Sequence, residues 1–226
     1  MKKLVVLTGA GMSAESSIST FRDSDGLWEN HDVMEVASIE GWHKNPSLVL
    51  DFYNKRRAQL KEVKPNKGHL ILAELEKEYN ITIVTQNVDN LHEKAGSSDI
   101  IHLHGELTKV RGEFSPDESI HWEDNLSIGQ KNEKGEQLRP DIVWFGEAVP
   151  KIEEAARIVS QADILLIIGT SLQVYPAAGL LHYAKPHVPV YYIDPKPANI
   201  YDLANPLEVI SKGGSEGMEI FKKMLS

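Results

Sequence analysis

The sequence predicts an α/β protein: a Rossmann-like, doubly wound parallel sheet that carries a small inserted lobe. Four short apolar runs are continuous rather than alternating, which is typical of strands buried on both faces. Helical periodicity lies between the runs, and such alternation favours a parallel sheet covered by helices. The chain has 226 residues, 41% hydrophobic and 25% charged, which suits one large globular domain with an insertion.

The expected strands are residues 4–7, 81–84, 164–168 and 190–193. Apolar residues at helical spacing predict helices over 70–76 and 152–159, before the second and third strands, and over 220–225 near the C-terminus. Polar or glycine-containing residues follow each strand at once. Since ligands of doubly wound sheets bind beyond the carboxyl ends of the strands, these residues are the first candidates for chemistry.

Two stretches depart from the alternation. Residues 28–68 have helix-like patterns without a strong strand, and residues 108–139 are polar and irregular. The second stretch is long for an irregular connection inside a compact domain. We therefore expect these two stretches to form a discontinuous small lobe. Residues 1–27, 69–107 and 140–226 would form the sheet domain.

The composition excludes several classes of function. The cysteine count is zero, which excludes disulfides, thiolate nucleophiles, iron–sulfur clusters and thiolate zinc sites. The charge is 24 − 33 = −9, which argues against nucleic-acid binding. No apolar run reaches the roughly 18–20 residues of a membrane span, and the first run breaks at Gly9 rather than continuing as a signal peptide would. We expect a cytoplasmic, monomeric protein.

The first strand is followed by a glycine-rich turn. Gly9 and Gly11 are two residues apart, and Ala14 stands where a third glycine often does. This pattern allows close approach of a phosphate to the backbone at the start of a predicted helix. It is equally compatible with an ordinary strand-to-helix turn. Phe21-Arg22-Asp23 comes shortly afterwards and would suit either a cover over a bound nucleotide or plain surface and core.

Polar side chains also follow the second strand. Gln86, Asn87 and Asp89 offer amide and carboxylate groups that suit hydroxyls and a carboxamide. An Asx-rich turn that caps a helix is the alternative. His102 and His104 alternate, and in a strand they would share a face. One would suit a general base near neutral pH, whereas a purely structural role is the alternative.

Taken in order, these segments resemble the sirtuin family of NAD-dependent protein-lysine deacylases. The matching stretches are residues 9–16, 21–22, 85–92, 102–106, 143–147 and 169–171. They follow the family order and span nearly the whole chain. The resemblance implies a Rossmann-type NAD-binding domain and a small lobe. NAD, as co-substrate, and an acylated lysine of a protein would meet between the two.

The resemblance also implies roles for individual residues. His104 matches the family's general base, and Asn87 matches the residue that contacts the nicotinamide ribose. The cofactor-binding residues would be Gly9, Ala10, Gly11, Ala14, Glu15, Phe21, Arg22, Trp28, Gln86, Asn87, Val88, Asp89, Gly169, Thr170, Ser171, Asp194, Pro195, Lys196 and Gly213. The substrate backbone would pair with the segments that contain Val143, Phe145, Gly146, Glu147, Leu172 and Val174.

One further match concerns the acyl group. Tyr53 and Arg56 resemble the Tyr-x-x-Arg pattern of sirtuins that remove succinyl, malonyl or glutaryl groups. On a helix, positions i and i+3 share a face, so the hydroxyl and the guanidinium would bind a distal carboxylate jointly. The alternative is a common tetrapeptide on a solvated helix.

The chain departs from the family pattern in two regions. Most sirtuins carry two Cys-x-x-Cys pairs where residues 107–138 of this chain contain none, so no thiolate zinc site is expected and packing must hold the lobe together. Residues 111–124 look like a hairpin, with Trp122 as a packing anchor. In the cofactor loop, Ser17 and Ser19 replace the usual Gly and Pro, and Ser17 would be strained if its φ is positive. Asp194 replaces the usual Asn near the adenosine ribose.

The sequence leads to three hypotheses. The first is a zinc-free NAD-dependent lysine deacylase that favours acidic acyl groups and yields nicotinamide and O-acyl-ADP-ribose. The second is a protein ADP-ribosyltransferase or a plain deacetylase that uses the same first step. The third is a module that binds NAD or ADP-ribose without turnover.

Overall fold

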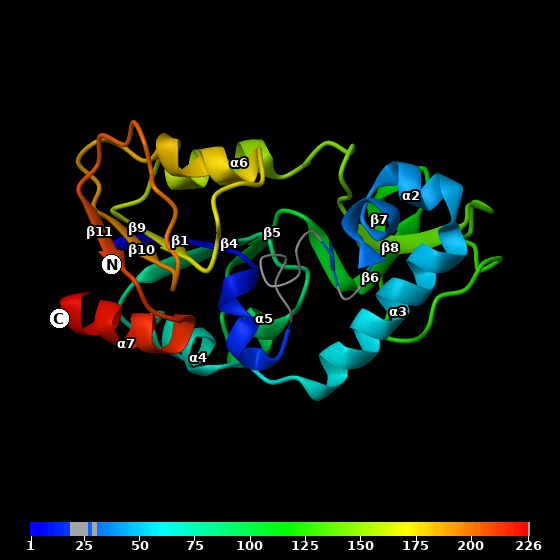
Figure 1. Cartoon of the computed structure of the whole chain (residues 1–226), viewed down its shortest axis with the longest axis horizontal. Coiled ribbons are helices and arrows are strands. Elements are labelled where there is room, and N and C mark those ends of the chain that lie inside the picture. Colours follow the sequence, from blue (N-terminus) through cyan, green and yellow to red (C-terminus); the bar gives the residue numbers. More distant parts are fainter. Residues whose placement is uncertain (19–26, 29–30, 226) are drawn as a thin grey trace.

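The computed structural model describes residues 1–18, 27–28 and 31–225. Within this part of the chain, six parallel strands form the main sheet in the order β11-β10-β9-β1-β4-β5. Their bounds are Lys3–Thr8 for β1, Asn80–Thr85 for β4, Ile100–His102 for β5, Ile164–Ile168 for β9, Val190–Ile193 for β10 and Leu207–Ile210 for β11. The predicted Rossmann-like sheet with an added small lobe is confirmed (Figure 1).

The two outer strands, β5 and β11, were not among the predicted strands. Each is an edge of the sheet and lacks the continuous apolar run of the central strands. In β11, Leu207 is 38% exposed and Val209 is 42% exposed. An edge strand is covered on fewer sides, so the pattern on which the prediction rested is absent there.

Helices cover both faces of the sheet (Figure 1). Helices α4 (Lys67–Leu75) and α7 (Gly214–Leu225) lie together on one face, and α6 (Ile152–Val159) lies on the other with the 3₁₀ segment η4 (Ala177–Tyr183). The short α5 (Leu91–Ala95) follows β4. The three predicted helices correspond to α4, α6 and α7. No helix of the described residues has the length and apolarity that crossing a membrane requires.

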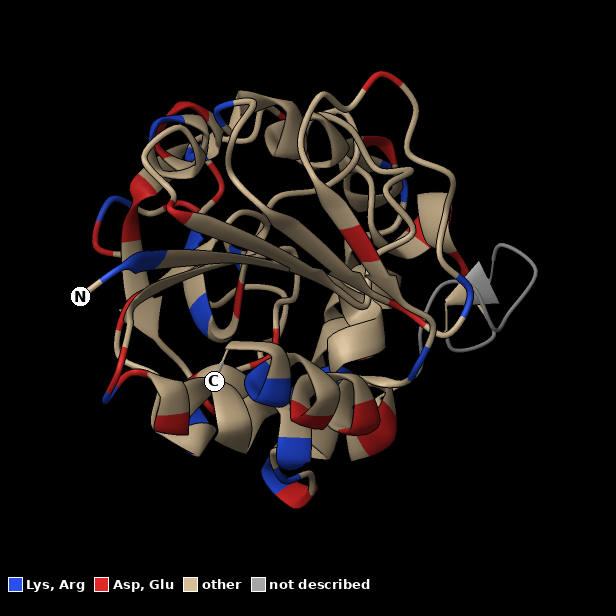
Figure 2. Cartoon of the chain, turned by 90° about the vertical axis from the view of Figure 1, so that its left-hand side faces the viewer, with Lys and Arg blue, Asp and Glu red and all other residues tan. Residues whose placement is uncertain are grey.

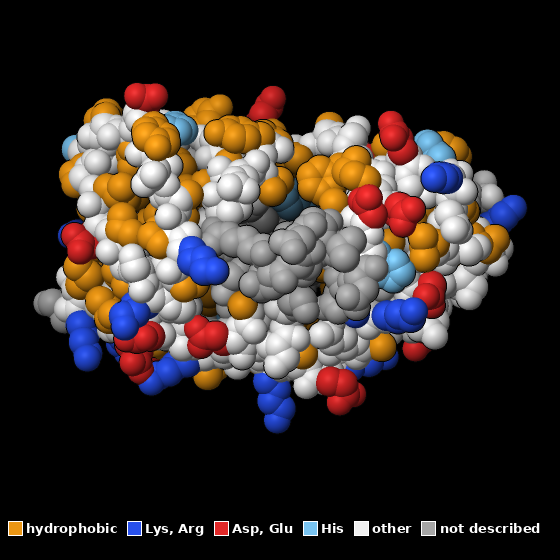
Figure 3. Space-filling view, viewed as in Figure 1, with side chains coloured by type: hydrophobic (Ala, Val, Ile, Leu, Met, Phe, Trp, Pro, Cys, Tyr) orange, Lys and Arg blue, Asp and Glu red, His pale blue; other side chains and the backbone are white. Residues whose placement is uncertain are grey.

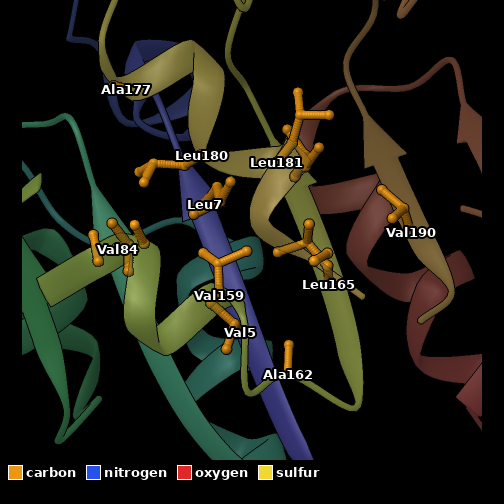
Figure 4. Packing of buried hydrophobic residues seen from close by; sticks show 14 of the residues in the cluster. Val5, Leu7, Val84, Val159, Ala162, Leu165, Ala177, Leu180, Leu181 and Val190 are labelled. Carbon is orange, nitrogen blue, oxygen red and sulfur yellow. The ribbon is translucent and has the colours of Figure 1, made fainter. Parts of the chain in front are cut away.

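Strand β1 shows how the core is built. Val5 and Leu7 pack in the cluster under α6 and η4, whereas Leu4 and Val6 pack in the cluster under α4 and α7. This alternation follows from the two-residue period of a strand. Figure 4 shows the first cluster, in which Val5 and Leu7 meet Val159. In Figure 2, Lys, Arg, Asp and Glu lie mostly on helices and loops, and the central strands carry almost none.

The small lobe combines helices with an antiparallel sheet. Its helices are α1 (Val33–Val36), α2 (Ile39–Lys44) and α3 (Pro46–Glu62). The antiparallel sheet has the strand order β7-β6-β8, with the bounds Gly105–Gly112 for β6, Ser115–His121 for β7 and Leu138–Ile142 for β8. A separate two-stranded sheet pairs β2 (Leu27–Trp28) with β3 (His31–Asp32). The hairpin predicted over 111–124 is the β6–β7 pair. Trp122 packs, partly buried, against the lobe core, as predicted.

Candidate active site

The glycine-rich turn after β1 packs directly on the turn after β9. The Gly11 N–H donates to Gly169 O at 2.8 Å, and the Gly9 N–H donates to Ile168 O at 3.1 Å. A Cβ added at Gly9 or at Gly11 would lie 2.8 Å from an atom of Gly169, and Gly169 itself has a φ of 64°. The close approach of two backbones therefore requires glycine here, independently of any phosphate.

The prediction of a helix after this turn is wrong, because no α-helix forms there. Two short 3₁₀ segments, η1 (Ala10–Met12) and η2 (Ala14–Ser16), take its place. Ser17 then adopts a φ of 64°, so the condition for the predicted strain is met. Its carbonyl accepts a hydrogen bond from Gln59 of α3 at 3.1 Å. Phe21, Arg22 and Ser19, also assigned to this loop, lie outside the described residues.

A buried polar cluster joins the first turn to the segment after β4. Asn87 Nδ2 donates to Ser13 Oγ at 3.1 Å, and Ser13 Oγ donates to Asp89 Oδ2 at 2.9 Å. The Leu91 N–H donates to Asp89 Oδ1 at 3.0 Å. Burial raises the pKa of Asp89, although these hydrogen bonds oppose the rise. Asn87 and Asp89 were predicted site residues; Ser13 was missed, and its hydroxyl just after Gly11 was the available signal.

His104 lies in the turn between β5 and β6, not in a strand, so the prediction that it shares a strand face with His102 is wrong. The reason is that β5 ends at His102 and that Leu103 and His104 form a turn before Gly105, whose φ is 82°. His104 Nδ1 lies 3.1 Å from Gln86 O, the contact of a ring N–H with a carbonyl. Burial lowers the pKa of His104. The ring is thus neutral near pH 7, with Nε2 as its basic nitrogen.

The residues assigned to adenosine lie at the ends of β9 and β10. Gln86 Nε2 donates to Thr170 Oγ1 at 3.2 Å, which links the segments after β4 and β9. Asp194 is buried, and its Oδ1 accepts the Lys196 N–H at 2.8 Å.

Glu15 reaches the start of α7, where its Oε1 accepts the Ser215 N–H at 3.0 Å. Ser171 is half-buried and Pro195 exposed. A Cβ at Gly213 would lie 2.7 Å from the same Glu15 oxygen.

A small cavity of about 40 Å³ lies between the two parts of the molecule. Its lining residues are Ile18, Trp28, Arg56, Gln59, Leu60, Val88, Asp89 and Leu107. Figure 3 shows a hollow in the surface between these parts. This volume is enough for a few ordered water molecules. A larger ligand therefore requires side chains to move. Arg56 from α3 and Asp89 from the β4 side line the same cavity.

Tyr53 does not line this cavity. It is fully buried, and its hydroxyl accepts the indole N–H of Trp144 at 3.0 Å. Burial raises the pKa of Tyr53 well above its usual range. Its ring contacts the ring of Trp28 edge-on, with 6.2 Å between the ring centroids, and Trp28 does line the cavity. Arg56 instead stacks on Phe52, with 5.6 Å between the guanidinium carbon and the ring centroid.

The segment after β8, assigned to the substrate backbone, is tied into the small lobe. The Phe145 N–H donates to Ala37 O at 2.9 Å, and the Phe145 side chain is 43% exposed. Gly146 has a φ of 90°. Glu147 binds Arg139 through both carboxylate oxygens, at 2.8 and 2.9 Å. The Glu147 side chain therefore points into the protein and stabilises this loop through Arg139, rather than facing a substrate. The other assigned segment includes Leu172, with a φ of 55°, and the half-buried Val174.

The structural zinc site that the resemblance would imply does not fit this chain, because the chain has no cysteine. Among the described residues, one group brings three possible metal ligands together: Glu93, His102 and Glu106, within 4.8 Å of one another. Two of these already form an ion pair, since His102 Nε2 lies 2.7 Å from Glu93 Oε1. Glu106 pairs with Lys109.

Comparisons with known proteins agree with this geometry. A model of the Sir2 family matches residues 9–176. An NAD-dependent protein deacylase of Bacteroides thetaiotaomicron is 59% identical over 231 residues, which cover 100% of this chain and 98% of the relative. One of Helicobacter pylori strain 26695 is 59% identical over 219 residues, which cover 97% and 95%.

Solved structures agree as well. A Sir2 homologue in complex with NAD has a TM-score of 0.87 and 37% identity, and the match covers 100% of this chain and 91% of that one. A Sir2 protein bound to an acetylated peptide has a TM-score of 0.79 and 26% identity, with coverage of 98% and 92%.

Proposed function

The chain belongs to the Sir2 family and is an NAD-dependent protein-lysine deacylase, and from this premise we propose that it prefers acidic acyl groups, such as succinyl, malonyl or glutaryl, over acetyl. The observation that carries the proposal is the place of Arg56. This cation lines the cavity between the two parts of the molecule together with Val88 and Asp89, which the proposed NAD site includes. An acyl chain that enters from the lysine side would meet NAD and Arg56 in one space.

The lining of the cavity favours a carboxylate partner for Arg56. Trp28, Leu60 and Leu107 are apolar, so a distal carboxylate there would have little competition from water. A guanidinium binds a carboxylate through two parallel hydrogen bonds.

The residues present fit NAD. The backbone turns at Gly9, Gly11 and Gly169 lie at the carboxyl edge of the sheet, where nucleotide phosphates bind in this fold. Within the described residues, Ser16 Oγ and Asn90 Oδ1 are buried without a hydrogen-bond partner, as atoms awaiting a polar ligand would be.

We assign the reaction roles as follows. NAD, when bound, supplies a ribose carbon from which nicotinamide can leave. Asn87 and Asp89 orient the riboside, and the Ser13 hydroxyl fixes both side chains. His104 uses Nε2 to accept a proton from a ribose hydroxyl, because its Nδ1–H is held by Gln86 O. The oxygen of the substrate's acyl group would form the bond to this ribose carbon as the bond to nicotinamide breaks. Addition of one water molecule would then release the lysine amine and leave the acyl group as an ester of ADP-ribose.

The test is the variant Arg56→Met, assayed with NAD and matched succinyl-lysine and acetyl-lysine peptides. Loss of a charge-assisted hydrogen bond, worth about 1.5–3 kcal/mol, lowers kcat/KM for the succinyl peptide by about 10- to 100-fold. The acetyl peptide should keep its rate within about threefold. Arg157→Met, a change of an exposed arginine on α6, is the control. Equal losses for both peptides would refute the acyl preference.

Tyr53→Phe probes the second member of the Tyr-x-x-Arg pair. The change removes the acceptor of the Trp144 indole N–H, so it lowers the melting temperature as well as any acyl selectivity. The ratio of succinyl to acetyl kcat/KM separates the two effects. An unchanged ratio would restrict carboxylate recognition to Arg56.

A further inference from the structure

Two histidines hold the carbonyls of two successive residues. His104 Nδ1 lies 3.1 Å from Gln86 O, and His102 Nδ1 lies 3.0 Å from Asn87 O. His104 is the proposed general base. His102 has no role in the proposed reaction, although it fixes the residue whose side chain would contact the ribose. His102 is buried, with 4% of its side chain exposed.

The other nitrogen of His102 is held as firmly. Its Nε2 lies 2.7 Å from Glu93 Oε1 of α5. Burial opposes a charge on the ring, but the hydrogen bond and the charge of Glu93, together with the charge of Glu106, raise the pKa of His102 above 6.5. Burial likewise opposes the charge of Glu93, and His102 nevertheless lowers the pKa of that carboxyl. Both shifts favour an ion pair between the two groups, whose atoms lie 2.7 Å apart.

Several charged and titratable groups face the His102 ring. They are Glu93 and His92 from α5, Glu106 and its partner Lys109 from β6, and Asp89 from the segment after β4. Burial lowers the pKa of His92, so that ring stays neutral. The surroundings of His102 are therefore mainly acidic, which suits an imidazolium that donates from both nitrogens.

We infer that the Glu93–His102 pair is a positioning device that fixes the Asn87 carbonyl and, through it, the Asn87–Asp89 segment against the nicotinamide riboside. The reason is geometric. Asn87 and Asp89 each bind Ser13 through their side chains, and the Asn87 carbonyl that His102 holds lies on the backbone between them. A shift of the segment at this carbonyl would therefore displace both side chains from the hydroxyl. The inference rests on the proposed function, in which these two residues orient NAD. Neither Glu93 nor His102 touches substrate in this arrangement.

Two substitutions of His102 separate positioning from folding. His102→Leu removes both donors, and we expect KM for NAD to rise about tenfold or more, because misplacement of orienting groups by about 1 Å is costly. His102→Asn retains a donor close to the position of Nδ1 and should recover most of the affinity. Direct NAD titration without acyl peptide should show the same order. An unchanged KM in a folded His102→Leu variant would overturn the inference.

Two substitutions of Glu93 supply a second readout through the KM for NAD. Glu93→Gln keeps an oxygen that can accept the hydrogen bond from His102 Nε2, so KM should stay near that of the unmodified protein. Glu93→Ala removes this acceptor and should raise KM, while kcat at saturating NAD changes little. Glu74→Ala, at the remote ion pair with Lys222, should leave KM unchanged.

These outcomes are distinguishable from a failure of the acyl preference. Because the pair acts on NAD, its variants should change succinyl and acetyl turnover by equal factors, whereas Arg56→Met should change their ratio. If His102→Leu fails to fold, the KM of Glu93→Ala for NAD decides. A KM equal to that of the unmodified protein would refute the positioning role.

Discussion

The sheet domain and the small lobe are held together in different ways. The central strands of the sheet bury apolar residues on both faces, and each strand is hydrogen-bonded in continuous parallel register to its neighbours. The small sheet has register shifts in both of its strand pairs. Its lobe buries three arginines, Arg57, Arg111 and Arg139. Apolar contacts dominate in the first region, whereas the second combines an apolar cluster of its own with buried charged side chains that make specific polar contacts.

Helix α3 supplies the most concentrated of these polar contacts. Arg57 donates to Leu107 O at 2.9 Å and to Asp124 O at 3.3 Å. Asn54 donates to Leu126 O at 2.9 Å and accepts the Leu126 N–H at 2.8 Å. These bonds fasten the loop that lies where the related family carries its zinc cysteines. We infer that the side chains of α3 take over part of the cohesion that a metal gives elsewhere.

Acid should weaken the sheet domain first, and this is the largest effect we expect. Burial lowers the pKa of His69 to about 4, although Glu15 and Glu93 oppose the shift, and burial also lowers the pKa of His92. The unfolded chain takes up these protons below about pH 6.5 and the folded chain does not. Stability is therefore complete above pH 6.5 and falls toward pH 4, by about 3 kcal/mol for His69 alone. Urea unfolding at several pH values measures this loss.

His69→Gln tests the assignment of the acid effect. Glutamine cannot titrate, and at the third position of α4 it can still accept the Asn66 N–H as His69 does. The loss between pH 6.5 and 4 should shrink by about 3 kcal/mol. His121→Gln, at an exposed histidine of the small lobe, is the control. A loss of the same size in His69→Gln would place the acid sensitivity elsewhere.

Arg57→Met should open the small lobe without unfolding the sheet. The change leaves the Leu107 carbonyl without its partner, at a cost of roughly 1–3 kcal/mol. Burial lowers the pKa of Arg57 to about 10, so the native side chain is still charged at neutral pH. Amide hydrogen exchange of Leu126 in the lobe should speed up, and that of Leu165 in β9 should change little.

Two further variants serve as the negative and the positive control for the Arg57→Met experiment. Lys55→Met lies on the same helix and removes only an exposed ion pair with Asp51, so exchange should be unaffected. Leu165→Ala cuts into the sheet core and should accelerate exchange throughout the protein. If Arg57→Met also speeds exchange in β9, the two regions unfold as one unit and the contrast between them fails.

The same contrast explains how much the sequence could predict. The central strands could be read because burial on both faces makes their sequences continuously apolar. Asn87 and Asp89 could be singled out because they follow a strand. His104 could be singled out because it alternates with His102 and matches the general base of the family that the sequence resembles. The partners of these residues could not, since Ser13 meets Asn87 across 74 positions of the chain. Nothing local marked the ion pair of Glu93 and His102 either.

The lobe was the least predictable region. Its hairpin over 111–124 was foreseen, but the role of Asn54 and Arg57 was not, because both look like ordinary polar residues of an exposed helix. For Tyr53, the sequence predicted a functional role, but its side-chain contacts could not be read from the sequence. A helical spacing of three residues correctly placed Tyr53 and Arg56 on one helix, but the indole of Trp144 binds the Tyr53 hydroxyl, and only Arg56 lines the cavity.

Chelation should have the smallest effect of all. Because the lobe has no thiolates and is fastened by Asn54 and Arg57, a stringent zinc chelator should leave both deacylase activity and melting temperature unchanged. Thiol reagents should be equally without effect, since no cysteine exists to react. A relative with the four cysteines is the positive control and should lose stability. A loss of activity on chelation would show that a bound metal matters, and the cluster of Glu93, His102 and Glu106 would be the site to substitute first.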